Sequence, residues 1–438
     1  MEYLIFTGYL VLFAWLVTKT RFFLRSGLSK SQLVILFLLK VIAGIFYGWM
    51  GIYYGGTAQM IDTWAYHYNG LAEYHLLGSD PSAYFTNLFH SGYEHGYRGF
   101  FDSSDSYWND LKGNIFIKFL SIFNIFSFGY YYVNVIFYSF IAFFGPIAFY
   151  RVMKDVFPRQ KNTVLAGSFF IPSFLYWGSG LHKEGLLFLG IGLIIFAIYF
   201  AQKKGRISAG AVGSVLLGLL LLFLLRSFTF AIMLPAIFCW LLVIRWKPRK
   251  PFLVFAGVYL GFCLLFFTAK YISPALDFPK SVAEKQQAFI ANVGSSSLPA
   301  RELEPTVASF ILNTPQAISF STFRPYPSDI RHILSLFAAV EVMLVIFVML
   351  LFVFMRRKGW PVPHPVIYFC FFFSLSLLLA IGFSVNNLGA ICRYRSVVLP
   401  LLLTPMLAAI NLKGIASLFT NGNNGNAAAT GNTDNTHD

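Results

Sequence analysis

Apolar runs long enough to cross a lipid bilayer follow one another along most of the chain, separated by short polar turns. A membrane-spanning helix needs about 20 predominantly apolar residues. On that measure the pattern predicts about eleven spanning helices. They lie near residues 3–18, 31–53, 130–150, 162–180, 185–202, 208–225, 228–244, 251–269, 334–355, 366–385 and 396–412. We therefore expect residues 1–413 to form an all-α, polytopic integral membrane domain.

Two long segments interrupt the apolar runs, at residues 54–129 and 270–333. Within the first, residues 113–126 place their polar side chains on one stripe of a helix, with Ile or Phe elsewhere. The stripe consists of Asn114, Lys118, Ser121 and Asn124. A helix of this kind is expected to lie in the membrane interface rather than to span.

The basic residues predict which side of the membrane each turn faces. Lys and Arg gather in the turns that follow the first, third, fifth, seventh, ninth and eleventh predicted helices. Cytoplasmic turns are enriched in these residues. The prediction is a bacterial inner-membrane protein with a periplasmic N-terminus and two long periplasmic loops. The polar, low-complexity residues 414–438 are expected to be a disordered cytoplasmic tail.

Composition supports the membrane prediction and excludes other classes. Apolar residues make up 57% of the chain and charged residues 12%, with a mean hydropathy of +0.65. These values exclude a soluble enzyme. The net charge of +15 comes from short basic clusters between apolar runs rather than from one basic face. The expected partners therefore include membrane lipids and exclude nucleic acid.

Neither cysteines nor histidines form a compact metal-binding motif. The cysteines Cys239, Cys263 and Cys370 lie inside apolar runs, and Cys392 borders a loop. This distribution fits neither a disulfide framework nor a zinc site. The histidines of the first long loop, at positions 67, 75, 90 and 95, match no compact ligand spacing. No metal site is predicted.

Asp62 is the first candidate for chemistry. It lies in the segment GGTAQMIDTWAYHYNG, and Tyr66 and His67 follow one helical turn later. A carboxylate at the lipid–water boundary can accept a proton from an attacking hydroxyl or bind a metal. An Asp before a helical run is also a preferred N-cap. The sequence leaves both roles open, and the two are compatible.

Lys183 and Glu184 are the second candidates, within YWGSGLHKEGLLFLG at residues 176–190. Charged side chains near lipid are costly unless they are paired or solvated. At the start of a helix, Lys183 is well placed to contact a phosphate, because the backbone N–H groups there already favour an anion. The alternative is that both side chains reach the membrane interface and mark a turn.

The third candidates are arginines on the predicted outer side, where the positive-inside pattern disfavours them. They are Arg226, Arg324, Arg393 and Arg395. Arginine is suited to bidentate contact with phosphate. The alternative is that these arginines pair with the acidic first loop. We expect Lys183, Arg393 and Arg395 to meet at one cavity at the depth of the outer headgroups.

Two further charged residues, Lys40 and Glu341, lie inside predicted spans. A charge at this depth is by default a candidate for function. Equally, Glu341 can pair with Lys40 or with an outer arginine inside the bundle. The sequence does not decide between these interpretations.

These features resemble the polytopic C-type glycosyltransferase superfamily and related bacterial surface-polysaccharide membrane proteins. Asp62 with Tyr66 and His67 looks like the acidic first-loop motif of that superfamily. Three further segments are similar to ones that recur in bacterial members. They are WGSGLHKE at 177–184, FRPYP at 323–327 and GAICRYRSVVLP at 389–400.

The resemblance implies transfer of a hexosyl or pentosyl group from a polyprenyl-phosphate-linked donor, with inversion, to a glycan or lipid acceptor on the periplasmic face. It makes Asp62 the base or a metal contact. Lys183, Arg393 and Arg395 become candidates for the donor phosphate. The chain lacks the soluble outer domain and second acidic motif of typical members, so no cofactor is assigned and the use of a divalent metal stays open.

Two other functions remain alternatives. An O-antigen or exopolysaccharide polymerase, which transfers a lipid-linked oligosaccharide en bloc, also has many spans and cationic outer loops, and it has less need of a carboxylate base. A lipid-linked glycan transporter or flippase requires charges along a central path, for which Lys40 and Glu341 are the candidates.

Overall fold

The structure is a computed structural model, and it describes residues 1–53, 62–89, 96, 107–291, 296–357 and 363–411. Every regular element in this part is a helix; the β-structure there consists of two isolated bridges, Ser297 with Asn387 and Arg356 with Ile410. The all-α prediction is therefore confirmed. The predicted tail, residues 414–438, lies outside the described residues.

Within the described part, eight helices are long and apolar enough to cross a membrane, or nine if one bent pair is a single span. The eight are α1 (Glu2–Lys19), α3 (Lys30–Tyr53), α7 (Tyr131–Val156), α10 (Lys183–Lys204), α12 (Ser227–Trp246), α13 (Pro251–Thr268), α16 (Ile333–Phe354) and α17 (Pro365–Ser384). The pair is α18 (Leu388–Ser396) and α19 (Leu399–Ala409), bent by 58°. These helices make the chain a multi-pass membrane protein.

Eight or nine helices of the described part have the length and hydropathy of a span, against about eleven predicted. The predicted runs outside this set are 162–180 and 208–225. The predicted span 162–180 is broken into α8 (Lys161–Phe169) and α9 (Pro172–Trp177). Pro172 disfavours the helical conformation at Ile171, whose backbone is extended. Helix α11 (Ala209–Leu225) is a single helix of 17 residues, slightly shorter than the spanning helices. The break between α8 and α9 was not predicted, because hydropathy does not detect helix breaks.

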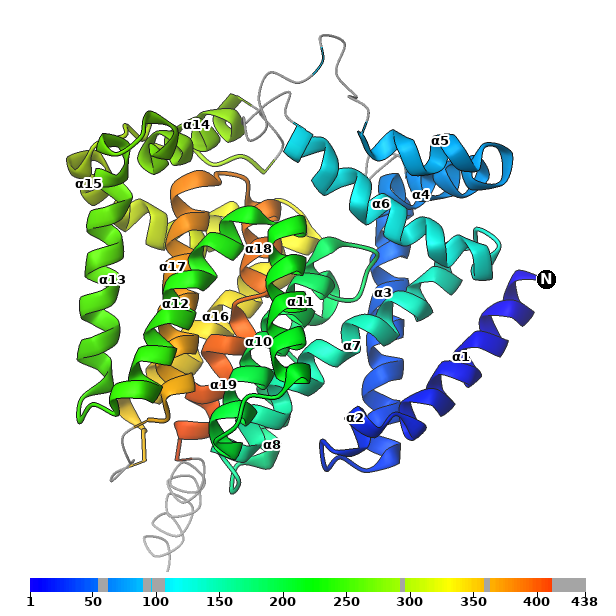
Figure 1. Cartoon of the computed structure of the whole chain (residues 1–438), viewed down its shortest axis with the longest axis horizontal. Coiled ribbons are helices and arrows are strands. Elements are labelled where there is room, and N and C mark those ends of the chain that lie inside the picture. Colours follow the sequence, from blue (N-terminus) through cyan, green and yellow to red (C-terminus); the bar gives the residue numbers. More distant parts are fainter. Residues whose placement is uncertain (54–61, 90–95, 97–106, 292–295, 358–362, 412–438) are drawn as a thin grey trace, which may run out of the picture.

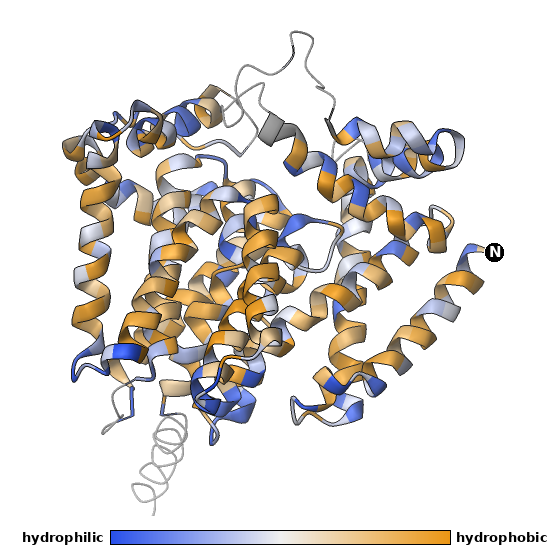
Figure 2. Ribbon diagram, viewed as in Figure 1, coloured by the Kyte–Doolittle hydropathy of each residue, from blue (hydrophilic) through white to orange (hydrophobic). Residues whose placement is uncertain are grey.

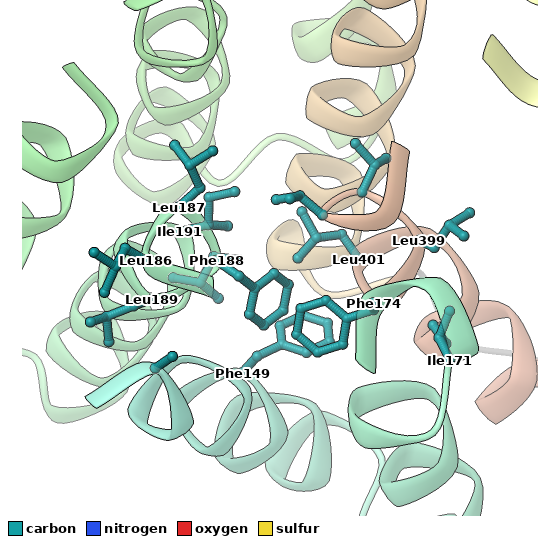
Figure 3. Packing of buried hydrophobic residues seen from close by; sticks show 14 of the residues in the cluster. Phe149, Ile171, Phe174, Leu186, Leu187, Phe188, Leu189, Ile191, Leu399 and Leu401 are labelled. Carbon is teal, nitrogen blue, oxygen red and sulfur yellow. The ribbon is translucent and has the colours of Figure 1, made fainter. Parts of the chain in front are cut away.

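The core of the bundle forms where α10 packs between α7 and α11. Small residues allow this close packing, since a Cβ added at Gly192 would lie 2.6 Å from the carbonyl oxygen of Gly145. Aromatic rings fill the adjacent space, as Figure 3 shows for Phe149, Phe174 and Phe188. The Phe174 and Phe188 ring centroids lie 4.4 Å apart. Helix α10 is thereby fixed deep in the protein, with most of its side chains buried.

Basic turns gather at the lower end of the bundle in Figures 1 and 2, where α2 (Arg21–Leu24) and α8 lie. Direct contacts join turns that are distant in sequence. The Lys154 ammonium donates to the carbonyl of Ser26 at 2.9 Å, and Lys203 donates to Asp155 at 2.7 Å. The turns after the first, third and fifth predicted helices therefore share one end of the molecule.

Helices outside the set of candidate spans cover the opposite end, at the top of Figure 1. They belong to the two long segments between spans. From the first come α4 (Asp62–Ser79), α5 (Pro81–Thr86), η2 (Asn87–Phe89) and α6 (Tyr107–Ser127), and from the second η3 (Ala269–Tyr271), η4 (Pro274–Leu276), α14 (Phe278–Ala291), α15 (Val307–Ile318), η5 (Ser319–Phe323) and η6 (Pro327–Asp329).

Helix α6 turns its polar stripe towards the protein, and it is not among the candidate spans of the described residues. The Lys118 ammonium is buried and donates to the Glu73 carboxylate and the Tyr84 carbonyl, each at 2.5 Å. The exposed side chains of this helix include Ile122, Ile125 and Phe126. The polar stripe thus faces α4 and α5, because a polar side chain is satisfied there at lower cost than in lipid.

Candidate functional site

Asp62, the first residue of α4, meets two segments that are distant in sequence. Its Oδ2 lies 3.2 Å from Nε2 of His182, the N-cap residue of α10, and accepts a hydrogen bond from Nη1 of Arg393 in α18. The Asp62 side chain is 51% exposed, whereas that of His182 is 2% exposed. One carboxylate oxygen is therefore fixed by the protein while the group stays accessible from outside.

Glu184 is a second, fully buried carboxylate in the same cluster. Its Oε1 accepts a hydrogen bond from Nη2 of Arg226 at 2.6 Å and lies 3.8 Å from Nε of Arg393. Its Oε2 contacts Nδ1 of His182. A buried carboxylate is tolerated only when opposite charges and hydrogen bonds satisfy it. Arg393 thus pairs with the first loop, through Asp62, as the alternative expected, whereas Arg226 pairs with Glu184 of α10.

The turn before α10 positions His182 through close packing. A Cβ added at Gly180 would lie 2.0 Å from the ring of Tyr47 in α3, so only glycine fits there. The Tyr138 hydroxyl in α7 donates to the carbonyl of His182. His182 Nδ1 also lies 2.9 Å from the backbone N–H of Lys183, which caps the helix. The motif WGSGLHKE therefore orients the His182 ring towards Asp62.

Lys40 and Glu341 support this turn instead of pairing with each other. The Lys40 ammonium donates to the carbonyl of Gly178 at 2.5 Å and to the Ser179 hydroxyl at 3.3 Å. The Glu341 carboxylate accepts a hydrogen bond from the backbone N–H of Ser173 at 2.7 Å. Both expected ion pairs of Glu341 are absent among the described residues. Glu341 lies at the N-terminus of α9 and Lys40 at its C-terminus. A negative charge at the start of a helix and a positive charge at its end both interact favourably with the helix dipole.

Lys183 points its ammonium at the ring of Tyr66, 5.4 Å from the centroid. In the part of the chain that the structure describes, no acid forms an ion pair with Lys183. Burial, followed by the charge of Asp62, raises the pKa of Tyr66 to about 12. Tyr66 is therefore a hydrogen-bond donor at neutral pH, beside a cation available to a ligand.

Further positive charge surrounds Lys183. Lys112 of α6 lies close enough to interact with it electrostatically. Burial, and then the charge of Lys285 in α14, lower the pKa of Lys112 to about 8. Lysines from three elements thus add to the two arginines near this end of the bundle, and the resulting potential favours an anion.

Tyr394 lies between the two arginines of the cluster. The guanidinium of Arg226 sits 3.9 Å from its ring centroid, and that of Arg393 sits 5.1 Å away. Nη2 of Arg393 also donates to the Tyr394 hydroxyl at 3.4 Å. Sequence reasoning missed Tyr394 and His182, although both lie within motifs that were singled out for their neighbours.

Arg395 does not join this cluster. Its Nη1 donates to the carbonyl oxygens of Arg324 at 2.8 Å and Ser321 at 3.3 Å, and its side chain is buried. The prediction that Lys183, Arg393 and Arg395 meet at one cavity is therefore wrong for Arg395. Residues two positions apart in a helix face different directions. In α18, Arg393 turns towards Asp62 while Arg395 holds the segment around Ser321.

Arg324 is also separate from the cluster. Its Nη1 donates to the Asp329 carboxylate at 2.9 Å, and its guanidinium lies 5.0 Å from the Tyr326 ring centroid. These contacts close a turn within the motif FRPYP. The structure thus gives Arg324 a partner within five residues, and the expected convergence of the outer arginines holds for Arg226 and Arg393.

His67 faces the bundle rather than Asp62. It is buried, and its Nδ1 lies 3.4 Å from Nδ2 of Asn134, which in turn donates to Asn124 at 2.6 Å. Burial lowers the pKa of His67 to about 4, although a backbone hydrogen bond at Gly129 opposes this change. His67 is therefore neutral at physiological pH, in a polar cluster that joins α4, α6 and α7.

The environment of Asp62 stabilises its ionised form. The hydrogen bond from His182 is the largest cause that holds the pKa of Asp62 well below its usual value; burial opposes it, and the charge of Arg393 supports it. The described residues contain no group of three or more His, Cys, Asp or Glu arranged to hold a metal ion. The carboxylates of Asp62 and Glu184 instead have guanidinium partners.

The chain matches no family model, no curated protein and no solved structure. The residues that bear on function are Asp62, His182, Lys183, Glu184, Arg226, Arg393 and Tyr394. We refer to these seven residues as the charged cluster.

Proposed function

We propose that the protein is a membrane glycosyltransferase. It transfers a hexosyl or pentosyl group from a polyprenyl-phosphate-linked donor to an acceptor hydroxyl on a glycan or lipid, in cell-surface glycan assembly. The observation that carries this proposal is a half-exposed carboxylate, Asp62, held beside cations from three other segments at one end of a membrane bundle. Such a site suits a substrate that combines a phosphate with a membrane-embedded tail.

Lys183 and Arg393 are the proposed ligands of the donor phosphate. Lys183 has a ring partner but no acidic partner among the described residues. Arg393 shares the Asp62 carboxylate with His182, and its guanidinium retains donors that suit a planar, bidentate contact. Arg226 is held by Glu184 and contributes charge without direct contact. Tyr66 and Tyr394 offer rings for the sugar face.

Asp62 is the proposed base. The acceptor oxygen attacks the anomeric carbon, the bond to the donor phosphate oxygen breaks with its electron pair, and the acceptor proton passes to Asp62. A carboxylate with a strongly lowered pKa is a weak base. Donor binding makes Asp62 a stronger base in this proposal. A phosphate that draws Arg393 away from Asp62 removes one of the causes of its lowered pKa. The base is then strongest when the donor is bound.

The proposed location is the bacterial inner membrane. The end that carries the basic turns faces the cytoplasm, since such turns are retained there. The charged cluster and the helices α4 and α6 then face the periplasm, with the N-terminus periplasmic and residues 414–438 cytoplasmic.

An en bloc polymerase remains the second candidate. The low pKa of Asp62 favours it, because that reaction relies more on cations and less on a carboxylate base. A flippase is less well supported, since the charges of Lys40 and Glu341 are bound at the two ends of α9.

The test uses the full chain in lipid nanodiscs with decaprenyl-phosphate-linked glucose, galactose, mannose and arabinose as donors, and a membrane lipid extract as acceptor. We expect release of decaprenyl phosphate with one of these donors. Asp62→Asn should abolish that release at unchanged protein abundance, while the control Glu284→Gln, an exposed carboxylate of α14, should retain it. Full activity of Asp62→Asn would contradict the assigned base and favour the polymerase.

A further inference from the structure

His182 lies between the two carboxylates of the charged cluster, and each of its ring nitrogens faces one donor and one acceptor. At Nδ1 the donor is the backbone N–H of Lys183, at 2.9 Å, and the acceptor is Oε2 of Glu184. At Nε2 the donor is Nη1 of Arg393, at 3.2 Å, and the acceptor is Oδ2 of Asp62, also at 3.2 Å.

This arrangement gives every protonation form of the ring a set of partners. A proton on Nε2 is donated to Asp62, while Nδ1 accepts from the Lys183 backbone. A proton on Nδ1 is donated to Glu184, while Nε2 accepts from Arg393. The doubly protonated ring donates to both carboxylates. A proton can therefore cross from one carboxylate to the other without rotation of the ring.

The surroundings hold the ring in this position. The Tyr66 ring lies 5.7 Å from it, and the rings of Tyr47 and Trp177 each lie 6.5 Å away. The Tyr138 hydroxyl fixes the backbone carbonyl. The titratable and charged groups that surround the ring thus come from five helices and the start of a sixth: Tyr47 (α3), Asp62 and Tyr66 (α4), Tyr138 (α7), Lys183 and Glu184 (α10), Arg393 (α18) and Arg226 before α12.

We propose that His182 is a proton relay between Asp62 and Glu184. This inference rests on the proposed function and deepens it. After transfer, the O–H bond of protonated Asp62 breaks and an N–H bond forms at Nε2, while the Nδ1–H bond breaks and an O–H bond forms at Glu184. Asp62 is again a carboxylate. The phosphate monoester that leaves the donor then takes the proton from Nε2 while Glu184 returns its proton to Nδ1, so the ring and both carboxylates are restored and the protons balance.

The first experiment observes the ring directly and does not depend on transfer. The protein is labelled with ¹⁵N in its histidine rings, and the His182 signals are assigned by their loss in His182→Asn. We expect wild-type signals averaged between the two neutral tautomers, displaced towards one tautomer by Asp62→Asn and by Glu184→Gln. His67→Gln, a buried histidine in contact with Asn134, is the control and should leave them unchanged. A single tautomer unaffected by both substitutions would overturn the relay.

The second experiment separates the relay from a structural role. Asparagine and glutamine can occupy this position but cannot carry a proton through a ring, so His182→Asn and His182→Gln are both used, with thermal unfolding as a check on folding. We expect the first turnover of decaprenyl phosphate release to persist and steady-state turnover to fall about a hundredfold. Equal losses in both phases, or no loss, would contradict the relay. Failure of the proposed function is distinct, because the wild type would then release no decaprenyl phosphate.

Discussion

Nη1 of Arg393 contacts Oδ2 of Asp62 across 331 positions of sequence. The contact pairs the arginine with a carboxylate of the first long segment, so that each side chain offsets the charge of the other. It also means that any anionic ligand of Arg393 competes with Asp62. When a phosphate displaces Asp62 from Arg393, the phosphate is bound and the Asp62 carboxylate becomes a stronger base.

Arg393 and Arg395 should respond differently to substitution. We expect Arg393→Gln to weaken binding of decaprenyl phosphate by about tenfold, the value of one charged hydrogen bond, and Arg393→Lys to restore it partly. Arg395→Gln should lower thermal stability, because it removes donors to two buried carbonyls, and leave affinity unchanged. Quenching of tryptophan fluorescence measures the binding. Equal effects on affinity would contradict the separation of the two side chains.

Removal of Glu184 should destabilise the protein through the charge that it leaves behind. Glu184→Gln leaves Arg226, whose side chain is 11% exposed, without its carboxylate partner. We expect a loss of about 3–5 kcal/mol in the free energy of unfolding. The double variant with Arg226→Gln should be more stable than the single variant. Unfolding in mixed micelles gives both values, and a less stable double variant would count against the buried pair.

Stability should depend on pH through His67. Its pKa is lowered by burial from 6.5 to about 4 in the folded protein. As the pH falls, His67 binds a proton in the unfolded chain at a higher pH than in the folded protein. The free energy of unfolding therefore decreases below pH 6.5, and the loss is complete below pH 4. The full effect is on the order of 3 kcal/mol. In His67→Gln this contribution to the pH dependence of stability should be absent. Thermal unfolding of the wild type and of His67→Gln is measured between pH 8 and pH 4. The same pH dependence in both proteins would refute the prediction.

The proposed orientation can be tested by labelling from outside the cell. Cysteines are introduced at the exposed positions Glu284, Lys204 and Lys247, in a background with Cys263→Ala, which removes the exposed native thiol. We expect an impermeant maleimide to label Glu284→Cys in intact cells and the other two only after lysis. Labelling of Lys204→Cys in intact cells would reverse the orientation and move the charged cluster to the cytoplasmic face.

The sequence predicted most of the fold because one strong physical signal dominates it. Apolar runs identify membrane helices, and eight of the predicted runs correspond to long apolar helices. Local backbone geometry was harder to predict. The break at Ile171 before Pro172 divides a run that is mostly apolar on both sides, so hydropathy does not reveal it. The bend between α18 and α19 escaped prediction for the same reason.

The sequence predicted most of the residues of the charged cluster but not which of them pair with each other. The sequence identified five of its members, because a charged side chain beside apolar residues is costly unless it is paired or solvated. They are Asp62, Lys183, Glu184, Arg226 and Arg393. Their pairings depend on which helices are neighbours, and that information is absent from a single sequence. Helical periodicity would have separated Arg393 from Arg395 in advance. His182 had a local signal as well, since it stands directly before two charges at a helix start.

Two single side chains, Lys40 on α3 and Glu341 on α16, hold the ends of the short helix α9. Both α3 and α16 are long enough to cross the bilayer, and helices of this kind change their tilt when hydrocarbon thickness changes. Because Lys40 and Glu341 tie α9 to two different long helices, we expect a change in the relative tilt of α3 and α16 to reach the turn that carries His182.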